Sequence, residues 1–145
     1  IADVLVDPRT GETRVEKYFV ACDIGRQLNP LIVEGQLIGG VAQGLGGTFL
    51  EELTYSEDGQ LTTGTFADYM LPNVYNMPPV STLVLEDVQA GGNVLGVKGV
   101  GEIGPSGVAA TIGNAIADAL GTNTGLNILP FTPERVLSAA ATETR

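Results

Sequence analysis

The sequence contains no histidine and no tryptophan, and its single cysteine is Cys22. Without histidine the chain cannot build a Ser-His-Asp triad or a histidine-ligated zinc or copper site. A single cysteine excludes an internal disulfide, a cysteine zinc cluster and an iron–sulfur cluster held by this chain alone. Any chemistry must therefore come from carboxylates, lysine, tyrosine, backbone groups or a borrowed cofactor.

Basic residues are also scarce, because 7 Lys and Arg stand against 17 Asp and Glu, giving a formal net charge of −10. This balance argues against nucleic-acid binding, which depends on clustered cations. No apolar run approaches the ~20 residues of a membrane span, and no signal-peptide pattern opens the chain. We therefore expect a cytoplasmic protein without a membrane contact. Because it begins at Ile1, we interpret it as a segment of a larger protein.

Glycine, in contrast, is abundant: the chain has 20 glycines in 145 residues, set among valine, isoleucine, leucine and alanine. They concentrate in residues 35–47 and 91–107. Glycine in an apolar context indicates a close approach of the backbone to another element or to a ligand. Both readings remain open at this point.

The apolar pattern predicts an α+β fold in which strands and helices mix without strict β-α-β alternation. A hairpin is expected from strands over 1–6 and 13–22, joined by a turn at 7–11. A third strand is expected over 80–88 and a glycine loop over 91–104. Helices are expected from Pro30 to about residue 52, from Pro105, and from Pro133. No linker divides the chain, so residues 1–145 are treated as one segment of a domain.

The expected first helix presents two different faces. Its buried stripe should consist of Leu37, Val41, Leu45 and Phe49. Beside it runs a row of amides and glycines, formed by Gln36, Gly40, Gln43 and Gly47. Such a row admits a flat polar group close to the helix, but it also suits tight packing against another helix or a sheet.

The glycine loop contains Gly99-x-Gly101-x-x-Gly104, a literal match to the dinucleotide-binding fingerprint. We reject this interpretation, because that motif should join a strand to a helix and be followed by an acidic residue about 20 positions later. Pro105 follows the loop directly, and no acidic residue lies near position 124. A nucleotide-binding domain is therefore not predicted.

Glu102 gives the same loop a different use. It is flanked by glycines on an apolar loop ahead of a helix, where a carboxylate can lose part of its hydration and serve as a general base. Lys98 could neutralise an anionic group such as a phosphate. The alternatives are that Glu102 caps the helix and that Lys98 is a surface charge.

Short motifs also follow one another in a specific order. They are Asp7-Pro8-x-Thr10-Gly11, Asp23-Ile24-Gly25-Arg26 with Asn29-Pro30, Glu34-Gly35-Gln36 with Gly39-Gly40 and Gln43-Gly44, Asp68-Tyr69-Met70-Leu71-Pro72, Lys98-Gly99-Val100-Gly101-Glu102, and Leu129-Pro130-x-Thr132-Pro133-Glu134. In this order they resemble the C-terminal part of the molybdopterin-binding large subunit of the xanthine dehydrogenase, aldehyde oxidase and carbon-monoxide dehydrogenase family. The resemblance covers essentially the whole chain.

The resemblance implies a site. Glu102 would be the catalytic glutamate, which deprotonates the hydroxyl that attacks an electron-poor carbon. The cofactor would be molybdenum–molybdopterin, with the cytosine dinucleotide form as an alternative. It would lie against Gly35 and Gln36 and against the stretch formed by Lys98, Gly99, Val100 and Gly101. The pterin dithiolene would hold the metal, so no protein residue would ligate it.

The resemblance also implies partners. Electrons would leave through 2Fe-2S clusters and FAD on partner subunits or domains, within an oligomeric complex. The substrate would be a small molecule, an aldehyde or an N-heterocycle, hydroxylated with oxygen from water. The remainder of the large subunit carries further contacts in that family, so we expect residues 1–145 alone to be inactive. A non-catalytic assembly module that keeps the fold is the alternative.

Overall fold

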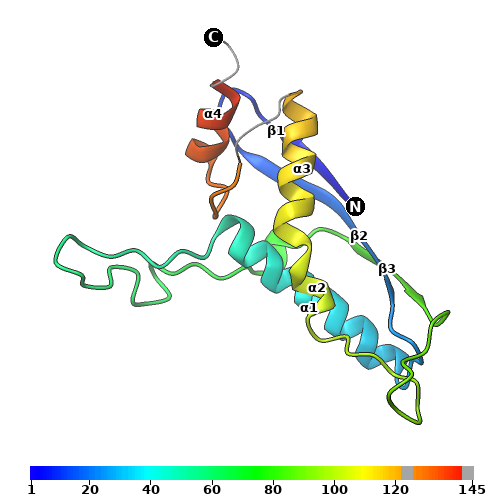
Figure 1. Cartoon of the computed structure of the whole chain (residues 1–145). Coiled ribbons are helices and arrows are strands. Elements are labelled where there is room, and N and C mark those ends of the chain that lie inside the picture. Colours follow the sequence, from blue (N-terminus) through cyan, green and yellow to red (C-terminus); the bar gives the residue numbers. More distant parts are fainter. Residues whose placement is uncertain (122–125, 142–145) are drawn as a thin grey trace.

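The computed structural model describes residues 1–121 and 126–141 of the chain. Helices pack on one side of a twisted sheet, and the predicted α+β class is confirmed (Figure 1). The strands are β1 (Ala2–Val6), β2 (Thr13–Asp23) and β3 (Val80–Leu85). The helices are α1 (Pro30–Phe49), α2 (Ile103–Ser106), α3 (Val108–Leu120) and α4 (Pro133–Ala141), with a short 3-10 turn η1 (Val74–Asn76).

The sheet has the order β1-β2-β3, with β1 antiparallel and β3 parallel to the central strand. The predicted hairpin is confirmed, and its turn is closed by a hydrogen bond of 2.8 Å from the Gly11 N–H to the Asp7 carbonyl. The third strand ends at Leu85 instead of residue 88. Its pairing with β2 stops there, and the Val88 N–H donates to the Asp23 carboxylate at 2.9 Å.

Helix α1 begins as predicted, because the Asn29 side chain accepts a hydrogen bond from the Ile32 N–H at 3.2 Å and Pro30 occupies the first turn. The predicted apolar stripe is confirmed, since Leu37 and Val41 are fully buried. The helix ends at Phe49, before residue 52. The Gly46 carbonyl accepts from the N–H groups of both Leu50 and Glu51, which closes the last turn.

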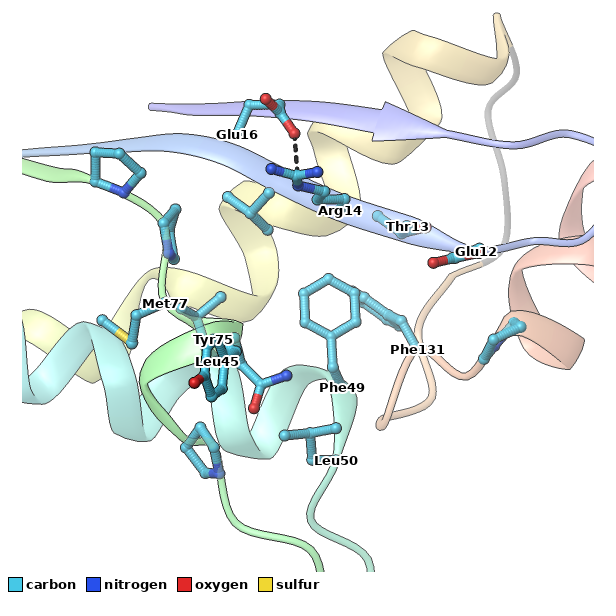
Figure 2. Close-up of a pocket in the computed structure, with 16 residues that line it drawn as sticks. Glu12, Thr13, Arg14, Glu16, Leu45, Phe49, Leu50, Tyr75, Met77 and Phe131 are labelled. Atoms are coloured by element: carbon cyan, nitrogen blue, oxygen red, sulfur yellow. Dashed lines mark ion pairs between the residues drawn. The ribbon is translucent and has the colours of Figure 1, made fainter.

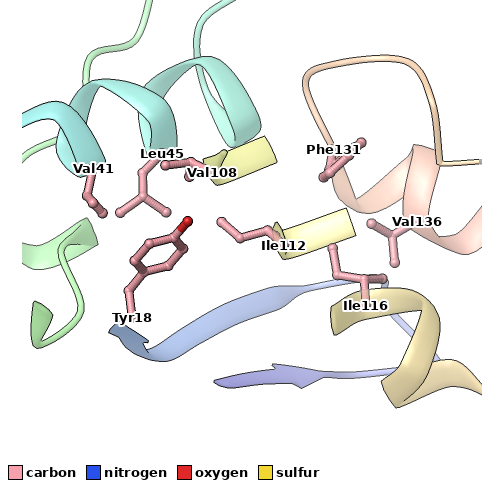
Figure 3. Packing of buried hydrophobic residues seen from close by; sticks show 8 residues of the cluster. All are labelled: Tyr18, Val41, Leu45, Val108, Ile112, Ile116, Phe131 and Val136. Carbon is pink, nitrogen blue, oxygen red and sulfur yellow. The ribbon is translucent and has the colours of Figure 1, made fainter. Parts of the chain in front are cut away.

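The main hydrophobic core lies between the inner face of the sheet and helices α1, α3 and α4 (Figure 3). Its members are Tyr18, Val41, Leu45, Val108, Ile112, Ile116, Phe131 and Val136. Each helix turns one apolar stripe toward this layer, which is the arrangement expected when helices cover one face of a sheet. A second, smaller cluster consists of Ile24, Val33 and Leu37 and lies toward the N-terminal end of α1.

Helices α1 and α2 meet at two glycines. A side-chain carbon added at Gly104 would lie 2.7 Å from the Gly40 Cα and 2.8 Å from the Leu37 carbonyl oxygen. Gly40 therefore belongs to a helix–helix contact, which is the packing alternative given for this row, whereas Gln36 and Gln43 are exposed. Close approach of the two backbones is the physical reason for both glycines.

The second helical region also differs from the prediction that it begins at Pro105. Helix α2 begins at Ile103, and Pro105 is tolerated because the N–H groups of the first turn have no partner within the helix. Gly107 then separates α2 from α3.

At the C-terminal end, α4 begins at Pro133 as predicted, and Thr132 Oγ1 accepts from the Arg135 N–H at 3.3 Å.

The connection over residues 50–79 first extends away from the body of the molecule and then returns to it, so that its last residues line a cavity beside β2 and the end of α1 (Figure 1). A tight turn lies at Gly59, which has a positive φ, and Tyr55 pairs with Leu61 across it. Near its base, the Tyr69 hydroxyl donates to Glu51 Oε2 at 2.6 Å, and this bond together with burial raises the pKa of Tyr69. Two adjacent glutamates, Glu51 and Glu52, are typical of a surface exposed to solvent. In the structure, however, Glu51 has a specific hydrogen-bond partner.

The glycine contact between α1 and α2 predicts a difference between two equivalent substitutions on one helix. Gly40→Ala should destabilise α1 by about 1–3 kcal/mol, because the added carbon would meet Gly104 Cα at 2.8 Å. Gly47→Ala, where nothing lies within 4 Å of the added carbon, should gain about 0.5–1 kcal/mol. Hydrogen exchange of the α1 amides in the full-length subunit measures both changes in helix stability. Equal protection of α1 in the Gly40 and Gly47 variants would contradict the contact.

Candidate functional site

Glu102 lies immediately before α2, at the position that caps this helix. Its side chain makes no capping hydrogen bond, and within residues 1–121 and 126–141 it has no hydrogen bond or ion pair. It is exposed, so the expected partial loss of hydration is not met by this chain itself. The carboxylate is therefore free to act on a group outside the fold, and the alternative that its side chain caps the helix is wrong.

The backbone on both sides of Glu102 is held firmly although its side chain is free. Val100 and Ile103 pack against the small cluster of Ile24, Val33 and Leu37. The Ser106 hydroxyl donates to the Glu102 carbonyl at 2.5 Å. Together with the glycine contact at α1, these interactions fix the place of the glutamate while leaving its carboxylate outward.

Lys98 is paired with a carboxylate of this chain and is only partly exposed, so it is not the solvated surface charge of the alternative. Its Nζ atom lies 3.2 Å from Asp23 Oδ1, and the two side chains are 32% and 23% exposed. The Lys98 N–H also donates to the Ile24 carbonyl at 2.8 Å. The glycine loop is thus attached to the end of β2 through both the backbone and the side chain of Lys98.

Asp23 joins three segments of the chain. Its Oδ1 atom accepts from the Gly25 N–H at 2.9 Å and from Lys98, and its Oδ2 atom accepts from the Val88 N–H at 2.9 Å. Gly25 has a left-handed φ of 67°, and a side-chain carbon there would lie 2.2 Å from the Gly96 carbonyl oxygen. The turn after β2 and the loop before Lys98 are therefore pressed together.

These hydrogen bonds, first that from Gly25 and then those from Val88 and Lys98, hold the pKa of Asp23 below its ordinary value. A carboxylate whose pKa is lower in the folded than in the unfolded chain stabilises the fold above about pH 4. That contribution disappears as the pH falls through the lowered pKa. At neutral pH the Asp23 carboxyl group is therefore ionised.

The remaining glycines of the predicted site have no packing role in this fold. A side-chain carbon added at Gly35, Gly99 or Gly101 would meet nothing within 4 Å, and none of the three has a positive φ. Gly35 and Gln36 are exposed on the turn of α1 whose inner residues, Val33 and Leu37, contact Val100 and Ile103. Open backbone of this kind can accept a flat group, whereas side chains would fill the space.

A cavity of about 440 Å³ lies elsewhere, beneath β2 at the C-terminal end of α1. Figure 2 shows Leu45, Phe49 and Phe131 beneath the strand, with Arg14 and Glu16 paired on it at 2.8 Å. None of the predicted site residues lines this cavity. Among the described residues, no group of three or more Asp, Glu or Cys side chains could hold a metal ion.

Sequence reasoning missed the role of Asp23. The motif Asp23-Ile24-Gly25 was significant only as part of the resemblance, yet an aspartate two residues before a glycine is typical of a turn in which the carboxylate accepts a backbone N–H. The pairing with Lys98 joins residues 75 positions apart, and no local pattern contains it.

A sequence profile described as the molybdopterin cofactor-binding domain matches residues 1–78, which is more than half of the 145 residues. The chain belongs to the molybdopterin cofactor-binding domain family. This confirms the family that the order of motifs predicts. The relatives of this chain are molybdopterin-dependent oxidoreductases of the xanthine dehydrogenase, aldehyde oxidoreductase and carbon monoxide dehydrogenase types.

Three relatives show the extent of the likeness. The chain is 41% identical over 138 residues to the 6-hydroxypseudooxynicotine dehydrogenase complex subunit gamma of Paenarthrobacter nicotinovorans, covering 95% of this chain and 17% of that protein. It is 42% identical over 137 residues to the nicotine 6-hydroxylase large subunit of the same organism, covering 94% and 17%. Quinoline 2-oxidoreductase from Pseudomonas putida 86 superposes with a TM-score of 0.89 at 38% identity, covering 97% of this chain and 18% of that one.

The chain thus spans about one sixth of the length of the curated relatives it matches. In the part of the chain that the structure describes, none of the helices combines the length and the hydropathy of a membrane span.

The free carboxylate of Glu102 predicts that its removal does not disturb the fold. Glu102→Gln should change the stability of α1 and α2 by less than about 0.5 kcal/mol, because no partner within the described chain is lost. Glu52→Gln is the matched control, since it breaks an ion pair of 2.7 Å with Arg135 and should cost about 0.2–1 kcal/mol in α4. Hydrogen exchange by mass spectrometry on the full-length subunit separates the two, and faster exchange in α2 of the Glu102 variant would contradict the assignment.

Proposed function

We propose that residues 1–145 form the C-terminal part of the large subunit of a molybdenum hydroxylase and contribute its catalytic base, Glu102. The observation that carries this proposal is a carboxylate without a partner in the described chain, set on a backbone that is fixed on both sides. Asp23, Glu51 and Glu52, in contrast, each have a hydrogen-bond or ion-pair partner within the chain.

The cofactor proposed for this site is molybdenum–molybdopterin, in the cytosine dinucleotide or the shorter form. It lies against Gly35 and Gln36 on α1 and against the backbone of residues 98–101. The support for this placement is that Gly35, Gly99 and Gly101 are open and have no packing role in this fold. When bound, the cofactor supplies the two-electron oxidation that accompanies hydroxylation of the substrate with water.

The residues of this chain then have separate tasks. Glu102 accepts the proton from the attacking hydroxyl, and its position before α2 keeps it at one place while the substrate enters. Val100 points into the small cluster, so only the backbone of the glycine loop faces the cofactor. The substrate class we propose is an aldehyde or an N-heterocycle, and nicotine and quinoline in the names of two relatives support the latter.

The remainder of the large subunit is needed for this activity, so we expect residues 1–145 alone to be inactive. Electrons leave through 2Fe-2S clusters and FAD on partner subunits, in an oligomeric complex in the cytoplasm. The names of two relatives, a dehydrogenase complex subunit and a hydroxylase large subunit, support such an assembly.

Replacing the base tests the proposed reaction. In the full complex, Glu102→Gln should lower kcat by more than about 10³-fold, because general base catalysis and the correct charge are both lost. Molybdenum and pterin contents should stay equal to those of the parent enzyme, measured by elemental analysis and by fluorescence of the released pterin. Near-normal turnover would refute Glu102 as the base. Absence of molybdenum from the native complex would favour the alternative, an assembly module that keeps the fold without the chemistry.

Glycines that face the cofactor should respond differently from glycines that face protein. Gly35→Ala should stabilise α1 by about 0.5–1 kcal/mol, because alanine is the better helix former and nothing lies within 4 Å of the added carbon. The same substitution should lower the pterin content of the purified complex several-fold. Gly47→Ala is the control, with the same gain in helix stability and unchanged pterin content. Full pterin content in the Gly35 variant would contradict the proposed cofactor placement.

A further inference from the structure

The loop that carries Glu102 is held by different kinds of interaction on its two sides. A side-chain carbon added at Gly99 or Gly101 would meet nothing within 4 Å, so these glycines give the backbone freedom without filling space. Val100 between them packs against the small cluster. On the C-terminal side, Gly104 lies against Gly40 and Ser106 binds the Glu102 carbonyl. On the N-terminal side, the last side chain with a polar partner before Glu102 is Lys98, paired with Asp23.

The Asp23 end of this pair is itself rigid. Its two oxygens accept N–H groups from Gly25 and Val88 at 2.9 Å each, so the carboxylate cannot turn away from Lys98 without breaking a backbone hydrogen bond. The Lys98 backbone is also fixed, because its N–H binds the Ile24 carbonyl. A half-buried ion pair between two fixed backbones restrains the loop more than an exposed pair between mobile side chains.

We infer that Lys98, held by Asp23, is a positioning residue for Glu102, and that its ammonium group acts through the loop backbone and not by contact with the cofactor. The inference rests on the proposed function of Glu102. Glycine on either side of Val100 allows the loop to fit closely under a flat group. The same backbone flexibility would also let the Glu102 carboxylate change its position. The ion pair removes that freedom at the N-terminal end without placing a side chain in the open space above Gly99 and Gly101.

The pair can be broken without disturbing the turn after β2. Lys98→Met removes the ammonium group and keeps a chain of similar length, while Asp23 retains its bonds to Gly25 and Val88. Lys98→Arg restores the charge. Arg9→Met is the matched control, because Arg9 forms an ion pair of 3.6 Å with Asp7 at the hairpin turn and its side chain is 88% exposed.

The experiment measures single-turnover reduction by substrate, kcat, KM and molybdenum content in the full complex. Lys98→Met should lower kcat about tenfold with KM within twofold and molybdenum content unchanged, and Lys98→Arg should recover at least a third of the lost rate. Hydrogen exchange at residues 99–103 should accelerate in the methionine variant only. In a Glu102→Gln background, Lys98→Met should leave the residual single-turnover rate unchanged, because a residue that acts through Glu102 has nothing left to position.

The outcomes are distinguishable from those of the proposed function. If Glu102→Gln retains turnover, the proposed function fails whatever Lys98 does. If Glu102→Gln is inactive but Lys98→Met keeps its kcat, the positioning role is refuted and the base assignment stands. Loss of molybdenum in parallel with kcat in the methionine variant would also overturn the inference, since it would make Lys98 a cofactor contact. An equal loss of rate in Arg9→Met would show an effect of general destabilisation and overturn it as well.

Discussion

The packing of α1 against α2 depends on two glycines that meet without side chains. At Gly40 and Gly104 the backbones approach so closely that any added carbon would overlap its neighbour. Protein interiors are packed too densely to absorb such an overlap locally, so α2 would have to move as a unit. Because Glu102 directly precedes α2, this contact sets the distance of the free carboxylate from α1, and the other anchors of the loop act within that limit.

The abundance of glycine has two separate causes in this fold. Some glycines face protein: Gly40 and Gly104 meet each other, and Gly25 lies against the Gly96 carbonyl. Others, such as Gly35 and Gly101, face open space and have no conformational need for glycine. The first group explains how the site is held, and the second marks the surface at which a close-fitting group can lie. The net charge of −10 contributes to neither.

Local patterns predicted the elements of the fold well, because capping residues, proline and the apolar period act within a few residues. Asn29, Pro30 and the stripe from Leu37 are examples. The errors arise where distant segments decide. The pattern of α1 alone leaves open whether Gly40 faces a ligand or another helix, because it contains no information about α2. The third strand ends before the predicted residue 88, where the Val88 N–H donates to the Asp23 carboxylate. Glu102 was found by its glycine neighbours and by the motif order, but the roles of Lys98 and Asp23 depend on a contact that no local spacing reveals.

The crossover between the parallel strands has a consequence for the order of assembly. Asp23 reaches partners that are 65 and 75 residues further along the chain, so the surroundings of Glu102 consist of long-range contacts. The hairpin of β1 and β2 and most of α1 can form early, since their contacts are local, whereas closing a loop of this length carries an entropic cost before it brings any contact. A ribosome-bound chain that stops before Lys98 therefore has the strands and α1, but it lacks the site and the core residues that α3 and α4 contribute. The site is among the last parts of this segment to become native.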